Sequence, residues 1–317
     1  MNGIIKNLNE KNWPSIKKYI KDNKIDWDYL VDQTNGLLHY LAYHDKIDLI
    51  KLIDPTILSK IILEPNNEGD TICHIAAKLN NIELLNFSIK IDSNIIYYKN
   101  KLECTPLYYI AQNDKLIKNI VKSIEIFDHH LNNEYTLVEY YILTNNFSMV
   151  IFILNNITIN KLTNEAIFTV IRSDNTTDFK IKLLDIFIEH GIDINILNNK
   201  FLSPLIVSIY QKEYEITKIL LENGANPNYY GPENNDHPLT ISIAQTDAPT
   251  LELLLEYDIN INIANKYLKT PVHYLFSVQN SIPVRIKCII LNKISSINST
   301  DNRMDSIFIR CHFLYCI

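Results

Sequence analysis

The side chains best suited to chemistry in this sequence are its nine histidines and five cysteines. Cys311, His312 and Cys316 stand close together, and His129 and His130 are adjacent. A structural zinc site takes four Cys or His ligands arranged as two recognisable pairs, and the three residues near position 311 do not supply them. We therefore predict no bound metal and interpret the histidine pair as solvated.

The motifs of the common enzyme classes are missing from the sequence. It contains no P-loop G-x-x-x-x-G-K-[ST], no nucleophile elbow G-x-S-x-G, no H-E-x-x-H zinc motif and no kinase catalytic loop. We predict that the chain is not an enzyme and uses no cofactor.

The remaining histidines point to a repeated word rather than to a catalytic site. The word occurs as Thr71-Ile-Cys-His74, Thr105-Pro-Leu-Tyr108 and Thr270-Pro-Val-His273, with shorter forms at 203–205 and 237–239. Measured from the fourth position or from the proline, successive words lie 31 to 35 residues apart, starting from His39. A fixed period of this length predicts a stack of repeated supersecondary units.

A second word repeats in phase with the first. It occurs at 152–160, 187–195, 220–228 and 254–262, where an apolar stretch leads into a turn and ends at an asparagine. Two words in phase make a chance match implausible.

Both words predict helix boundaries. A Thr or Ser hydroxyl caps a free backbone N–H, and proline at the first helical position loses no hydrogen bond, so first helices begin at Thr105, Ser203 and Thr270. The second word ends a second helix. Gly191 and Gly224 stand there at the position that favours the left-handed conformation.

Asparagine and aspartate are the residues that best tolerate that conformation after glycine. Asn156 and Asp258 occupy the equivalent places in two other repeats. We expect them to end their helices in the same way.

The two words resemble those of the ankyrin-repeat family, T-P-L-H-x-A and L-L-x-x-G-A-D-V-N, and the resemblance covers nearly all the chain. It implies an all-α solenoid of stacked helix pairs with short β-hairpin-like loops. It also implies a structural role for His39, His74 and His273, whose imidazoles would bond to turn backbone. Such stacks bind proteins and carry no chemistry of their own.

Residue usage adds information about the source. Ile and Asn together make up roughly three residues in ten, while glycine is scarce, as an A+T-rich genome would produce. The combination is similar to the ankyrin-repeat families of giant DNA viruses of amoebae and, less closely, to those of A+T-rich protists and intracellular bacteria.

We expect residues 1–317 to form one array. Residues 1–30 would be an N-terminal capping helix, with an amphipathic helix starting near 12. Residues 31–300 would hold about eight repeats, the fifth degenerate, with a helix at 164–172, an enlarged loop at 173–178 and a helix at 180–190. The most regular repeat has helices at 203–211 and 214–223, the eighth has its second helix at 284–294, and 301–317 would begin an incomplete ninth repeat.

Composition limits the partners. The net charge of −6 gives no basic signal for nucleic acid, and no run of 18 apolar residues predicts a membrane span. An odd number of scattered cysteines suits a reducing compartment. We expect a cytoplasmic monomer, in the host cytoplasm if the source is viral.

The resemblance places hairpin tips and the ends of first helices on the concave groove, where exposed tyrosines are typical of binding surfaces. Codon bias explains the 19 tyrosines equally well, and Tyr40, Tyr109 and Tyr274 fall at a position that normally packs inside. The predicted partner-binding residues are Tyr43, Asn67, Glu68, Lys101, Gln112, Asn113, Tyr135, Lys200, Tyr210, Asp236, Tyr267 and Lys269.

Two functions fit these predictions. The first is a non-enzymatic protein-interaction scaffold, in a virus or pathogen one that engages host proteins. The alternative is a targeting module shortened from a larger enzyme or from a ubiquitin-ligase adaptor.

Overall fold

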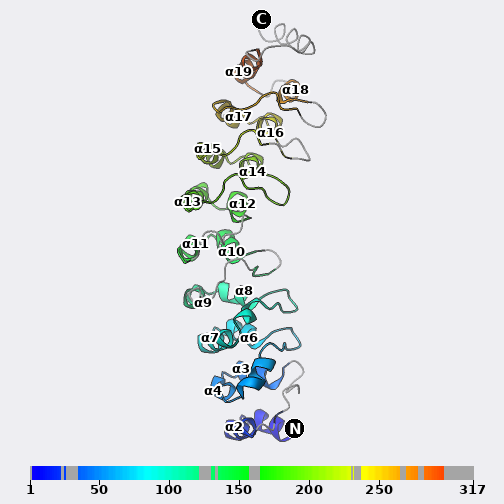
Figure 1. Cartoon of the computed structure of the whole chain (residues 1–317), viewed down its shortest axis with the longest axis vertical. Coiled ribbons are helices and arrows are strands. Elements are labelled where there is room, and N and C mark those ends of the chain that lie inside the picture. The colour runs from blue at the N-terminus through cyan, green and yellow to red at the C-terminus, as the bar shows by residue number, and fades with distance from the viewer. Residues whose placement is uncertain are drawn as a thin grey trace. The chain divides into compact units, whose positions relative to one another are not determined.

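A computed structural model describes residues 2–22, 25, 35–120, 130–132, 135–156, 165–229, 231, 237–264, 269–277 and 282–295. In these ranges the regular elements are helices, apart from isolated bridge residues, among them the pair His130 and Thr136 (Figure 1). The chain divides into two compact units, Met1–Leu162 (unit 1) and Thr163–Ile317 (unit 2).

Unit 1 is a series of helix pairs. The pairs are α1 (Asn2–Asn9) with α2 (Trp13–Lys21), α3 (Leu37–Tyr43) with α4 (Ile47–Ile50), α6 (Ile72–Lys78) with α7 (Ile82–Ile91), α8 (Pro106–Ala111) with α9 (Asp114–Ile120), and α10 (Leu137–Leu143) with α11 (Phe147–Leu154). Two further helices, α5 (Pro55–Ile61) and the 3₁₀ helix η1 (Ser93–Tyr97), follow the second and third pairs.

Unit 2 continues the pattern without such additions in its described residues. Its pairs are α12 (Glu165–Arg172) with α13 (Thr177–Glu189), α14 (Pro204–Tyr210) with α15 (Tyr214–Glu222), α16 (Pro238–Ala244) with α17 (Ala248–Leu255), and α18 (Pro271–Ser277) with α19 (Val284–Ser295). The helices predicted at 164–172, 203–211, 214–223 and 284–294 are thereby confirmed.

The first helices begin as their caps predict. The hydroxyls of Thr105, Thr136 and Ser203 accept the backbone N–H three residues on, at 3.3 to 3.4 Å, and α8 and α14 have proline at their first position. These bonds satisfy N–H groups that no helix turn can reach.

The first helix of most pairs ends in a Schellman motif. After α6, Asn80 has a φ of +56°, its N–H donates to Ala77 O at 3.1 Å, and the N–H of Asn81 donates to Ala76 O at 2.8 Å. Positive φ recurs at the equivalent residues, which are Lys11, Asp45, Asn145, Lys212 and Thr246. The turn closes the helix and aims the chain directly into the second helix.

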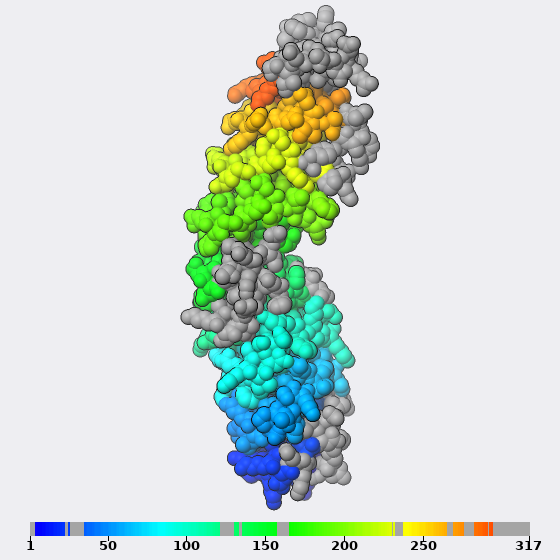
Figure 2. Space-filling view, viewed as in Figure 1, coloured from blue at the N-terminus to red at the C-terminus, as the bar shows by residue number. Residues whose placement is uncertain are grey.

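First helices form the core of each unit. In α14 every residue from Pro204 to Ile209 is buried, and in α6 every residue from Ile72 to Ala77. Within unit 1, α6 packs between α3 and α8, and within unit 2, α14 packs between α12 and α16. Figure 2 shows the described repeats of unit 2 in continuous van der Waals contact. No single pair could bury both of its faces, so each repeat depends on its neighbours.

Three local expectations differ from the structure. The helix expected from residue 12 is α2, and it is the second member of a pair rather than a lone helix, because the turn at Lys11 joins it to α1. The loop expected at 173–178 is shorter, since the Thr176 hydroxyl caps α13 and starts that helix at Thr177.

The third difference concerns the ends of second helices. Gly191 and Gly224 have positive φ as predicted, at +80° and +89°, but Asn156 and Asp258 do not. Asn156 instead donates its side-chain amide to Phe152 O at 2.7 Å, and at the other site Ile259 N–H donates to Tyr257 O at 2.8 Å. Other donors therefore satisfy carbonyls at those helix ends.

The incomplete ninth repeat, the Cys311–Cys316 segment and His129 lie outside the described residues. In the part of the chain that is described, no helix is long and apolar enough to cross a membrane. The same part holds no cluster of three or more residues that could bind a metal ion.

Candidate interaction surface

The ends of the first helices of unit 1 carry a row of large side chains. Tyr43 and Leu143 are the last residues of α3 and α10, Lys78 ends α6, and Gln112 caps α8. Tyr43, Gln112 and Leu143 are exposed, and Lys78 is half-buried. We call these four residues the first-helix row.

The hairpin loops between repeats form the second part of the surface. In three of them an asparagine closes the loop: Asn66 N–H donates to Asp70 O at 2.8 Å, Asn100 N–H to Cys104 O at 2.9 Å, and Asn198 N–H to Leu202 O at 3.1 Å. Their side-chain oxygens accept two further loop N–H groups each, at 2.9 to 3.1 Å. The loop tips are rigid platforms for the residues at their apex.

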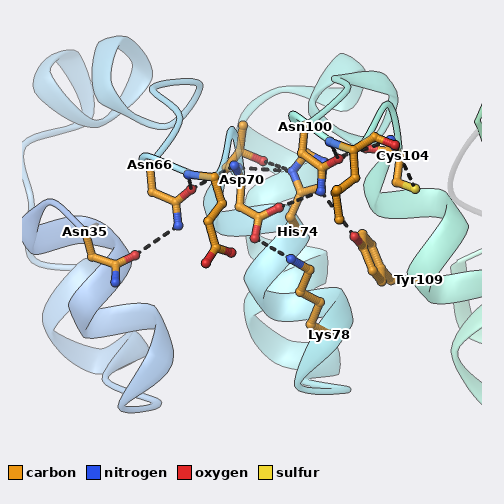
Figure 3. A network of polar contacts seen from close by, with 11 residues as sticks. Asn35, Asn66, Asp70, His74, Lys78, Asn100, Cys104 and Tyr109 are labelled. Atoms are coloured by element: carbon orange, nitrogen blue, oxygen red, sulfur yellow. Dashed lines mark hydrogen bonds and ion pairs between the residues drawn. The ribbon is translucent and has the colours of Figure 1, made fainter. Parts of the chain in front are cut away.

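A buried polar network supports both parts of the surface in unit 1 (Figure 3). Asp70 is fully buried and accepts Asn100 Nδ2 at 2.8 Å and Lys78 Nζ at 2.5 Å. Asn100 Nδ2 also donates to the Tyr109 hydroxyl at 3.1 Å. Two consecutive hairpins and two first helices are joined at one carboxylate.

The network fixes the charge of Lys78. Burial alone would lower the pKa of this amine, but the hydrogen bond and charge of Asp70, with smaller contributions from Tyr109 and Tyr43, hold that pKa above its usual value. The ammonium also lies 4.8 Å from the ring centroid of Tyr109. Lys78 is therefore a cation held between the Asp70 carboxylate and the Tyr109 ring.

The repeated histidines have the structural role that the resemblance implies. The backbone N–H of Thr71 donates to His74 Nδ1 at 3.0 Å, so the opposite nitrogen carries the proton and donates to Cys104 O at 3.1 Å. His273 Nδ1 accepts the Thr270 N–H in the same way at 3.0 Å. Glu139 replaces histidine in α10 and accepts the Thr136 N–H at 2.9 Å.

The structure places the predicted partner-binding residues in two groups. At helix ends lie Tyr43, Gln112 and Tyr210, which are exposed, and Asn113, which is half-buried. At hairpins lie Asn67, Glu68, Lys101, Tyr135, Lys200 and Lys269, all exposed. Consecutive hairpin tips of unit 1 are also bonded to each other, because Lys101 N–H donates to Glu68 O at 3.0 Å. Asp236 and Tyr267 lie outside the described residues.

Asn113 differs from the others because both ends of its amide act within the chain. Nδ2 donates to Asn80 Oδ1 at 2.8 Å, and Oδ1 accepts the N–H of Lys115 at 3.1 Å. Its predicted contact with a partner stays a prediction, as it does for the rest of the set.

Sequence reasoning missed Lys78, Leu102 and Phe201. Leu102 and Phe201 stand at hairpin tips and are 73% and 56% exposed. Aligning the loops on Asn66, Asn100 and Asn198 would have found Phe201, since it takes the place of Gly69 in the first of them.

Comparison with known proteins agrees with this geometry. Residues 167–265 match the family model for ankyrin repeats (3 copies). An ankyrin repeat protein of fowlpox virus is 32% identical over 115 residues, which is 36% of this chain and 19% of that protein. One of Acanthamoeba polyphaga mimivirus is 23% identical over 282 residues, covering 86% of this chain and 32% of the relative.

Among solved structures, the ankyrin repeat domain of Bcl-3 aligns with a TM-score of 0.53 at 17% identity, covering 67% of this chain and 99% of that domain. Residues 167–265 are thus ankyrin repeats, the helix pairs have the ankyrin-repeat fold, and the chain is similar to ankyrin-repeat proteins of a poxvirus and of a giant virus of amoebae. It spans about a fifth to a third of the length of these two relatives. Ankyrin repeats are typically non-enzymatic modules that bind proteins.

Proposed function

We propose that this chain is a non-enzymatic scaffold that binds a host protein in the cytoplasm, through the first-helix row and the hairpin tips. The observation that carries the proposal is the row itself. Tyr43, Gln112 and Leu143 are exposed at equivalent positions of successive repeats, and Lys78 is held among them by a buried carboxylate.

Holding the row in place lowers the entropic penalty of binding. Tyrosine offers a large, rigid contact area, and a lysine already oriented by Asp70 and Tyr109 loses little further freedom when a partner binds. A role in folding alone would not require exposed aromatic and aliphatic groups at these positions.

The test is a binding measurement on the intact chain. The chain is immobilised, exposed to lysate of Acanthamoeba polyphaga, and each retained protein is identified, purified and titrated against it. Tyr43→Ala and Leu143→Ala are each expected to weaken binding at least about tenfold. Lys218→Ala, on the exposed side of α15, is the matched control and should bind as the parent does. Equal affinities for all four proteins would contradict the proposal.

A second candidate is that these repeats target a longer protein, an enzyme or a ubiquitin-ligase adaptor. It is favoured by the length of the relatives, of which this chain spans about a fifth to a third. The mass of the protein in infected or native cells separates the two: a product much larger than 36.9 kDa supports the targeting module.

A further inference from the structure

Phe201 is a residue that local stability does not explain. Its side chain is 56% exposed and its φ is +56°. The equivalent residue of the first hairpin in unit 1 is Gly69, with a φ of +83°. A bulky residue at positive φ is strained, and an exposed ring gains little from burial, so the fold would favour glycine here.

The backbone around Phe201 is held firmly. Asn198 Oδ1 accepts the N–H groups of Lys200 and Leu202 at 2.9 and 3.0 Å, and Phe201 N–H donates to Asn198 O at 2.9 Å. The Tyr229 hydroxyl, from the next repeat, donates to Phe201 O at 2.8 Å. The ring therefore projects from a fixed loop, and a partner that encloses it has little loop motion to arrest.

The ring has polar neighbours. Asn199 and Lys200 precede it and are both exposed, and among the described residues Lys200 makes no ion pair. An apolar centre with a charged residue at its edge is the arrangement of a binding hot spot. The Lys200 ammonium group would pair best with an anionic group of the partner, beside the pocket that holds the Phe201 ring.

We propose that Phe201 and Lys200 form an anchor by which unit 2 binds a partner protein that offers an apolar pocket with a carboxylate at its rim. The ring fills the pocket, and the carboxylate pairs with Lys200. This inference rests on the proposed scaffold function and adds the chemistry of the partner.

The test exploits the strain at Phe201. Phe201→Gly places at this position the residue that the turn prefers, so the unfolding midpoint should stay equal or rise by up to about 4 °C. Binding should fall at least about tenfold, since the anchor is lost. Affinity is thus expected to fall while stability is unchanged or rises, which a structural role for the ring would not produce.

Glu103→Gly is the matched control. Glu103 occupies the equivalent loop position in unit 1, with a φ of +59°, and it is exposed. Its replacement should also leave the midpoint equal or higher, but without loss of binding. Lys200→Glu should weaken binding about tenfold or more by placing a like charge against the rim carboxylate.

Affinities are measured by calorimetry with the purified partner identified from the lysate above. If no protein binds the parent chain, the scaffold function fails and this inference with it. If a protein binds the parent and Phe201→Gly equally, the scaffold function stands and the anchor is refuted. A lower unfolding midpoint for Phe201→Gly would also refute it, because the ring would then be part of the core.

Discussion

Units 1 and 2 are both stacks of helix pairs, but they differ in where side-chain hydrogen bonds join one repeat to the next. We call a row of such hydrogen bonds a seam. In unit 1 the seam lies at the turns between paired helices, where Asn81 Nδ2 donates to Asp45 at 2.5 Å and Asn113 Nδ2 to Asn80 at 2.8 Å. Unit 2 also has a bond at these turns, from Gln245 Nε2 to Tyr210 O at 3.2 Å, and it adds a second seam at the connectors after second helices. Asn195 Nδ2 donates there to Gly224 O at 3.2 Å, and Asn228 Nδ2 to Asp258 O at 2.8 Å.

The difference shows what the abundant asparagines do. In unit 1 the amide oxygen of Asn81 caps its own helix by accepting Leu84 N–H at 3.0 Å, while the nitrogen reaches the preceding repeat. In unit 2 the oxygen of Asn195 accepts Asn226 N–H at 2.8 Å, so one side chain bonds twice to the next repeat. An amide suits both seams because it donates and accepts at once.

The largest effect is expected from the buried carboxylate of unit 1. Asp70→Ala removes the partner of Lys78 and Asn100 and should lower the free energy of unfolding by about 3–5 kcal/mol. In unit 2, Lys180→Met should lower it by only about 1–2 kcal/mol, because Met fills the space and Glu213 can turn to solvent. Urea unfolding measures both, and a greater loss from Lys180→Met would reverse this ranking.

Acid should destabilise unit 2 through His237. This residue stands at the N-cap position of α16, where the repeats of α6 and α14 have Thr or Ser. It is 1% exposed, and neither ring nitrogen has a hydrogen-bond partner among the described residues. Burial lowers its pKa to about 4, from 6.5. The unfolded chain therefore binds the proton more readily, and stability that is complete above pH 6.5 falls by about 3 kcal/mol as the pH drops toward 4.

His237→Ser is the control for that titration. It should remove this part of the pH dependence and restore a cap, raising stability at pH 7 by about 1 kcal/mol. Hydrogen exchange of α16 at pH 7 and pH 5 measures the change. An unaltered pH dependence in the variant would show that other groups cause the acid sensitivity.

Gly69 and Gly224 have similar positive φ, so substitutions at these two positions distinguish backbone strain from steric crowding of the new side chain. At Gly69 in unit 1 a Cβ would lie 2.6 Å from the backbone nitrogen of Lys101, whereas at Gly224 in unit 2 it would meet nothing within 4 Å. Gly69→Ala should therefore destabilise by about 2–3 kcal/mol. Gly224→Val should destabilise by about 1–2 kcal/mol, from its positive φ alone. If Gly69→Ala and Gly224→Ala lowered the unfolding midpoint equally, crowding at Gly69 would cost nothing. The next hairpin would then move away readily to make room for the Cβ atom.

The smallest effects concern the seams. Asn228→Ala removes bonds between repeats only and should destabilise by about 1 kcal/mol. Asn81→Ala also removes a helix cap and should destabilise by about 2 kcal/mol. Amide exchange in α7 and α15 measures the two. If the Asn228 variant lost more stability than the Asn81 variant, the capping role assigned to unit 1 would be wrong.

Local residues made most of the fold predictable. The first helices begin after Thr105 and Ser203 because a hydroxyl caps an N–H group of its own next turn, and at Thr270 the hydroxyl bonds instead to His273 Nδ1 at 2.9 Å. None of these bonds depends on another repeat. The positive φ of Gly191 and Gly224 was also predictable, because it depends only on the end of their own helix. Asn156 did not adopt positive φ, because its side chain offered the helix end another donor.

The candidate surface was less predictable. Tyr43 and Lys200 could be placed from the repeat register, and both are exposed. Lys78 could not, since its orientation depends on Asp70 in the preceding hairpin and Tyr109 in the next repeat. Phe201 was missed because its exposure and its φ become informative only together.

By itself, the sequence determined the period, the helix pairs and the ankyrin resemblance, since caps, turns and apolar stripes act over a few neighbouring residues. Only the tertiary structure decided that Asp70 is buried against Lys78 and Asn100, and which seam each unit uses. The seams and the Asp70–Asn100 bond join residues about 30 positions apart. Such bonds form only when one repeat packs on the next and excludes water, and that packing is a property of the stack rather than of any single word.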